Sequence, residues 1–141
     1  MLRTFCLLAA AAGVVATVDL AQKGLAISEQ GRAVFTHERS PLYVIGLVAA
    51  ALLWAGAVSL AGSTSIALAG GLVVGGAAGN VASIALWPSL PGVPDPIVAG
   101  GYAFNVADVA TALGLVLLLP ATLVFAGRNL GRLREPVSLR R

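Results

Sequence analysis

Charged residues are scarce in this sequence. They make up 11% of its 141 residues, whereas hydrophobic residues make up 58%, and a typical soluble protein has about 25% charged residues. Three long stretches, residues 4–18, 40–94 and 109–127, carry no charge at all. This composition excludes an ordinary soluble domain and indicates a chain that lies in a bilayer.

Cysteine and histidine are also nearly absent. The chain has one of each, Cys6 and His37, so an internal disulfide is impossible and too few soft ligands remain for a zinc site, which takes three or four. We therefore expect no metal and no cofactor. His37 lies beside Glu38 in a polar connection, and we expect it to be a solvated loop residue without a chemical role.

The uncharged stretches predict an all-α membrane protein with four transmembrane helices. A spanning helix needs about 20 apolar residues, so the central stretch holds two helices and each flanking stretch holds one. We expect a transmembrane domain over residues 1–127, with a tight turn at Gly62, a short first outer loop and a proline-rich outer loop that carries an aspartate. A basic cytoplasmic tail, residues 128–141, follows. The approximate spans are residues 3–23, 41–61, 65–87 and 104–127.

The first apolar run also fits the pattern of a cleaved signal peptide, because it begins after Arg3 and contains small residues. Asp19 and Lys23 favour a retained helix instead. They lie four residues apart with the acid first, which is the favourable order for an ion pair within a helix. The alternative is that both charges reach out to water at the helix end.

The distribution of charge predicts the orientation in the membrane. The chain ends beyond the spans carry six arginines and one glutamate, a net charge of +5, whereas the outer connections and the helix ends beside them carry a net charge of −2. The positive-inside rule then puts both termini in the cytoplasm. Asp95 and Asp108 fall on the outer side.

These two carboxylates are the candidate catalytic groups. Asp95 precedes Pro96, which favours an extended backbone at Asp95. Asn105 and Asp108 share one face of the first turn of the last helix, where the helix dipole stabilises a carboxylate. We expect both acids to face water. Two acids that meet retain one proton between them, as aspartyl hydrolysis requires, although a helix cap and a solvated loop residue would give the same spacing.

The third span carries a glycine at every fourth position, Gly71, Gly75 and Gly79. Small residues at this spacing let helix backbones approach closely in a membrane. Asn80 ends the series, and an amide inside a membrane bundle is normally placed to hydrogen-bond a partner.

Four segments together resemble the lipoprotein signal peptidase family, the type II signal peptidases. They are GLVVGGAAGN (71–80), VPD (93–95), FNVAD (104–108) and DLAQK (19–23). The resemblance implies a membrane aspartyl endopeptidase of the bacterial plasma membrane that cleaves prolipoprotein signal peptides before a lipid-modified cysteine. Its partners would be that lipidated peptide and membrane lipids, with no nucleic acid.

The same resemblance implies roles for individual residues. The catalytic dyad falls on Asp95 and Asp108, and Asn80 and Asn105 are polar supports. The other matched pair, Asp19 and Lys23, carries over as structural or substrate-adjacent groups.

The sequence departs from the family pattern in two places. Ser83 and Ile84 stand where the family usually has an Asp-Arg pair, and the first outer segment is shorter, with Glu29, Gly31 and Ala33 at the positions of an Asn-x-Gly-x-Ala motif. We therefore expect weak turnover or an altered substrate range. The alternatives are a non-catalytic four-helix relative that binds a lipidated peptide or membrane partner, and a small proton-linked transporter subunit.

Overall fold

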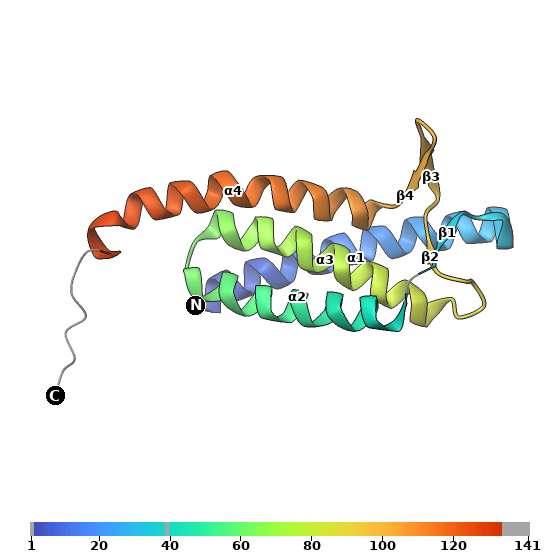
Figure 1. Cartoon of the computed structure of the whole chain (residues 1–141), viewed down its shortest axis with the longest axis horizontal. Coiled ribbons are helices and arrows are strands. Elements are labelled where there is room, and N and C mark those ends of the chain that lie inside the picture. The colour runs from blue at the N-terminus through green and yellow to red at the C-terminus, as the bar shows by residue number, and fades with distance from the viewer. Residues whose placement is uncertain (1, 39, 134–141) are drawn as a thin grey trace.

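The computed structural model describes residues 2–38 and 40–133 and contains four long helices. They are α1 (Leu2–Gln30), α2 (Pro41–Ala61), α3 (Thr64–Leu86) and α4 (Val106–Leu133). The helices run alternately up and down beside one another, and each is long and apolar enough to cross a membrane (Figure 1). The prediction of an all-α membrane protein with four transmembrane helices is confirmed.

The glycine series on α3 forms the contact with α1. A β-carbon at Gly71 would lie 2.8 Å from the carbonyl oxygen of Leu8, and one at Gly75 would lie 2.7 Å from that of Ala12. Both distances are shorter than van der Waals contact, so only glycine allows the two backbones to approach this closely.

Two further glycines let α3 contact the remaining helices. Gly70 faces the side chain of Val58 on α2, 2.9 Å from where its β-carbon would be, and Gly76 faces Thr111 on α4. α3 is therefore the central helix of the bundle, which accounts for its high content of buried residues.

The turn between α2 and α3 is as tight as predicted. α2 ends before Gly62, whose φ of 70° is the left-handed conformation that favours glycine at a helix C-terminus. Ser63 then caps α3, since its Oγ accepts a hydrogen bond from the backbone N–H of Ile66 at 3.5 Å.

Two helices extend beyond their predicted ends. α1 continues from Lys23 to Gln30, and α4 continues from Gly127 to Leu133. Charged residues limit the membrane-embedded part of a helix, but neither segment contains a proline that would end the helix itself. The predicted basic tail therefore begins inside α4, and its residues 134–141 lie outside the described part of the chain.

The α1–α2 and α3–α4 connections contain short strands as well as loops. β1 (Thr36–His37) pairs antiparallel with β2 (Val93–Pro94), and β3 (Ile97–Ala99) forms a hairpin with β4 (Tyr102–Phe104). The hairpin turn has positive φ at both of its glycines, as tight hairpin turns require. Figure 1 shows this hairpin standing away from the bundle at the end where α4 begins.

Candidate active site

Asp95 is held at the end of β2 by the pairing of the α1–α2 and α3–α4 connections. The backbone N–H of Asp95 donates to the carbonyl of Phe35 at 2.8 Å, directly before β1. β1 therefore covers Asp95, and the residue is fully buried. The expectation that Asp95 faces water is wrong, because the α1–α2 connection lies over it.

His37 contacts the buried carboxyl of Asp95. In the register of the two strands His37 lies opposite Val93, and its Nδ1 meets Asp95 Oδ2. The His37 side chain is 53% exposed whereas that of Asp95 is 1% exposed, so the imidazole lies between the carboxyl and the outside. The expectation that His37 lies in a loop is wrong, since His37 belongs to β1, and its half-exposed side chain contacts Asp95.

Asn105 and Asp108 cap the N-terminus of α4 reciprocally. The backbone N–H of Asp108 donates to Asn105 Oδ1 at 2.9 Å, and the backbone N–H of Asn105 donates to Asp108 Oδ2 at 3.3 Å. This is the geometry of a capping box, in which two otherwise unpaired N–H groups are satisfied. It fixes the Asp108 carboxyl at the positive end of the helix dipole.

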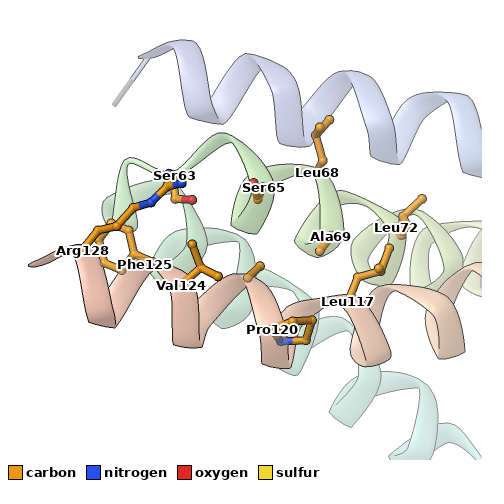
Figure 2. A pocket seen from close by; sticks show the side chains of 11 residues that line it. Ser63, Ser65, Leu68, Ala69, Leu72, Leu117, Pro120, Val124, Phe125 and Arg128 are labelled. Carbon is orange, nitrogen blue, oxygen red and sulfur yellow. The ribbon is translucent and has the colours of Figure 1, made fainter.

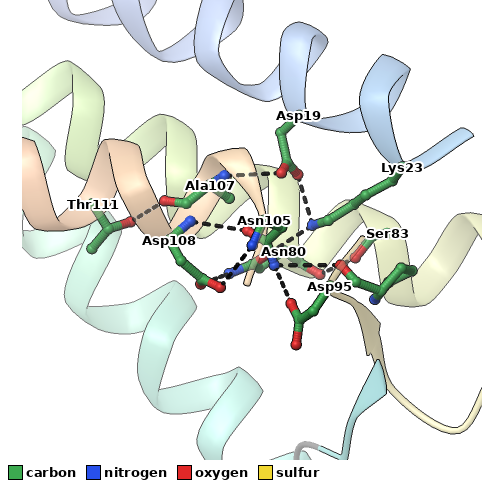
Figure 3. A network of polar contacts seen from close by, with 10 residues as sticks. Asp19, Lys23, Asn80, Ser83, Asp95, Asn105, Ala107, Asp108 and Thr111 are labelled. Atoms are coloured by element: carbon green, nitrogen blue, oxygen red, sulfur yellow. Dashed lines mark hydrogen bonds and ion pairs between the residues drawn. The ribbon is translucent and has the colours of Figure 1, made fainter. Parts of the chain in front are cut away.

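Asn105 also joins the two aspartates. Its Nδ2 donates to Asp95 Oδ1 at 2.5 Å while its backbone N–H donates to Asp108. Figure 3 shows the carboxyls of Asp95 and Asp108 on the same side of this network, opposite Asp19 and Lys23. The two predicted dyad residues thus share a single buried partner.

Asn80 contributes to the network from α3. Its Nδ2 donates to Asp108 Oδ1 at 3.1 Å, and its Oδ1 accepts from Lys23 Nζ at 2.8 Å. The predicted hydrogen-bonding role of this amide is confirmed. Ser83, one turn further along α3, is buried and its hydroxyl donates to the Asn80 carbonyl at 2.8 Å.

Asp19 and Lys23 form a buried ion pair. Lys23 Nζ lies 2.7 Å from Asp19 Oδ2, and both side chains are fully buried. The predicted pair within α1 is confirmed, and the alternative in which both charges reach out to water is wrong. Since neither side chain contacts water, each charge needs its partner.

Asp19 also stabilises the start of α4. Its Oδ1 accepts a hydrogen bond from the backbone N–H of Ala107 at 2.9 Å, one of the N–H groups that a helix leaves unpaired in its first turn. A β-carbon at Gly79 would lie 2.6 Å from Asp19 Oδ2. The last glycine of the series therefore makes room for a carboxylate of the site.

A cavity of about 240 Å³ opens beside Asp108, between α2 and α4. Asp108, Asn80 and Tyr43 line its polar end, and Leu47, Ala77 and Leu115 continue into an adjoining apolar cavity of about 210 Å³. Asp95 lines neither of these two cavities. The two cavities form one groove. The Asp108 carboxyl lines its polar end, and apolar side chains line the remainder along the helices.

Comparison with known protein families gives a match over most of the chain. The family described as Signal peptidase (SPase) II matches residues 7–124, a range that contains all six predicted site residues. No curated protein and no solved structure matches the chain. Because the family match covers most of the sequence, the chain belongs to the signal peptidase II family, a family of aspartic-type membrane peptidases that process lipoproteins.

Proposed function

We propose that the chain cleaves the signal peptides of lipid-modified prolipoproteins with Asp95 and Asp108 as its catalytic pair. The observation that carries the proposal is the shared contact with Asn105, which hydrogen-bonds a carboxyl oxygen of each acid. Asp95 lies in a connection and Asp108 on α4, and the buried Asn105 brings both carboxyls to one place.

The proposed chemistry follows from that arrangement. The ionised carboxyl takes a proton from a water molecule as the water attacks the scissile carbonyl carbon, and the protonated carboxyl hydrogen-bonds the carbonyl oxygen. The tetrahedral intermediate then collapses, the C–N bond breaks and the leaving amine takes up a proton from the pair. Asn80 and the Asn105 backbone N–H hold the Asp108 carboxyl, and the Asn105 side-chain amide holds that of Asp95.

The groove beside Asp108 supports a lipid-modified peptide as substrate. Its polar end contains Asp108 and Asn80, and its continuation along α2 and α4 is apolar. A signal-peptide segment or an acyl chain suits such walls, since an apolar group gains about 25 cal/mol for each Å² removed from water.

His37 belongs to the proposed site as a positioning residue. Asn105 occupies one oxygen of Asp95 and His37 the other, and the imidazole separates the carboxyl from solvent. We infer that His37 orients the Asp95 carboxyl, since it contacts the oxygen that Asn105 does not bond.

The proposed orientation has both termini in the cytoplasm and the site on the outer face. The described carboxylates of the site lie at one end of the bundle, and the exposed Arg3 and Arg128 belong to the opposite helix ends. This asymmetry supports the positive-inside assignment.

A non-catalytic relative that binds a lipidated peptide is the second candidate. Two observations favour it. Asp95 is buried, and Ile84 stands where the family usually has an arginine. One experiment separates the two. The purified protein is incubated with a diacylglyceryl-modified prolipoprotein, and cleavage and binding are measured for wild type, Asp95→Asn and Asp108→Asn.

We expect wild type to cleave and each variant to bind without cleaving. The double variant should lose little more activity than either single variant, because groups that act as a unit are non-additive. Equal binding by all three proteins without any cleavage would replace the enzyme with the binding protein.

A further inference from the structure

A second cavity, of about 500 Å³, lies between α3 and α4 near the turn that joins α2 to α3. It includes Arg128, which is 20 residues after Asp108 on α4, or about 30 Å along the helix axis. The cavity is therefore separate from the proposed active site and shares none of its residues.

The cavity has one polar end and otherwise apolar walls. Ser63, Ser65 and Arg128 supply hydroxyl and guanidinium groups at that end, and Figure 2 shows them together where α3 begins and α4 nears its end. Apolar side chains line the remainder, among them Leu72 and Phe125. A ligand that fits must carry a hydrogen-bonding head and an apolar body.

The hydrogen-bonding head of the ligand must be an anion. Within the described part of the chain Arg128 forms no ion pair. The N-terminus of α3 begins at Thr64 beside the two serines, and the dipole of that helix adds partial positive charge at the same end. The two hydroxyl groups, the guanidinium group and the positive end of the helix dipole all favour binding of a phosphate.

The apolar part of the ligand must be smaller than a protein helix. Two turns of a helix about 10 Å wide fill roughly 800 Å³, which is more than the 500 Å³ of the cavity. An acyl chain is thin enough to enter. We propose that this cavity binds a membrane phospholipid with an anionic headgroup, its phosphate at Arg128 and the serines, and one acyl chain between α3 and α4.

The test measures lipid binding to the purified full-length protein in detergent by native mass spectrometry. The probes are phosphatidylglycerol and phosphatidylcholine with identical acyl chains. We expect wild type to prefer phosphatidylglycerol, and Arg128→Gln to weaken that binding about tenfold, the size of one lost charge-assisted hydrogen bond. Arg128→Lys should keep most of the preference.

Arg3→Gln is the matched control, because Arg3 is an exposed arginine that does not line the cavity. It should leave the preference unchanged. If Arg128→Gln does not fold, Leu68→Trp tests the apolar wall instead and should weaken phosphatidylglycerol binding while the arginine stays.

Three results would overturn the proposal. They are equal affinity of wild type for the two lipids, equal loss in the Arg3 and Arg128 variants, and displacement of phosphatidylglycerol by millimolar inorganic phosphate. The last result would identify a site for a free anion. None of these readouts depends on peptidase activity, so they test the lipid site independently of the proposed function.

Discussion

Lys23 fixes the orientation of the Asn80 amide. Its Nζ donates to Asn80 Oδ1 at 2.8 Å, and because an ammonium group only donates, the amide nitrogen must point the other way, where it reaches Asp108 Oδ1 at 3.1 Å. A cation on α1 therefore determines which hydrogen bond α3 offers to a carboxyl on α4.

Asn80→Asp should lower the rate of prolipoprotein cleavage by about a hundredfold, as expected for loss of a positioned donor. The new carboxyl presents an oxygen to Asp108 where the amide presented an N–H. Asn129→Asp is the matched control, since Asn129 bonds Phe125 within α4 and lies far from the site. Steady-state cleavage assays measure both. Similar rates for the two variants would show that the Asn80 donor is dispensable.

Lys23→Met should destabilise the folded protein by about 3–5 kcal/mol, because Asp19 is then a buried charge without its cation. Adding Asp19→Asn should recover much of the loss, since an amide oxygen still accepts from Ala107. Denaturation in sodium dodecyl sulfate, followed by circular dichroism, gives the free energies. A double variant less stable than Lys23→Met would contradict this account.

Gly79→Ala should cost about 1–3 kcal/mol of stability by overpacking, since the added methyl group would lie 2.6 Å from Asp19 Oδ2. Gly56→Ala on α2 is the control, because nothing lies within 4 Å of its β-carbon position. It should change stability by less than about 1 kcal/mol. The same denaturation measurement compares them, and equal effects would rule out the close approach to Asp19.

His37→Ala should slow cleavage about tenfold or more, because misplacing a catalytic group costs up to about a hundredfold, and should leave stability unchanged, because the side chain is half exposed. Added imidazole should restore part of the rate. Glu38→Ala, the exposed neighbour, should behave as wild type. An unchanged rate in His37→Ala would remove His37 from the site while leaving the dyad in place.

Cysteines introduced at Gln30 and Thr64, in a Cys6→Ser background, test the orientation. Both positions are exposed at opposite ends of the bundle. An impermeant thiol reagent added to intact cells should label the cysteine at Gln30 and leave the one at Thr64 unreacted. The reverse pattern would invert the proposed topology.

The sequence predicts the four helices, the glycine contact and the Asp19–Lys23 pair because each depends on local information. Charge-free stretches mark the spans, and spacings of three or four residues mark helix faces. Asn105 and Asp108 are likewise neighbours on one turn, so their joint position could be anticipated.

The pairing of β1 with β2 could not be predicted. Strands of two residues carry no periodicity, and the paired residues lie 56 and 58 residues apart, while His37 and Asp95 lie 58 apart. The burial of Asp95 follows from that pairing, so it was missed with it. The one available signal was the proline on each side of Asp95, which indicated an extended segment but not its partner.

The network that joins Asp19, Asn80, Asn105 and Asp108 has consequences for biosynthesis. Its members come from α1, α3 and the start of α4, and α4 is made only after about three-quarters of the chain has been synthesised. Before α4 is made, Asn80 lacks the Asp108 carboxyl that it bonds, and Asp19 lacks the Ala107 N–H that it accepts from. The nascent chain therefore holds no assembled site while its first three helices enter the bilayer.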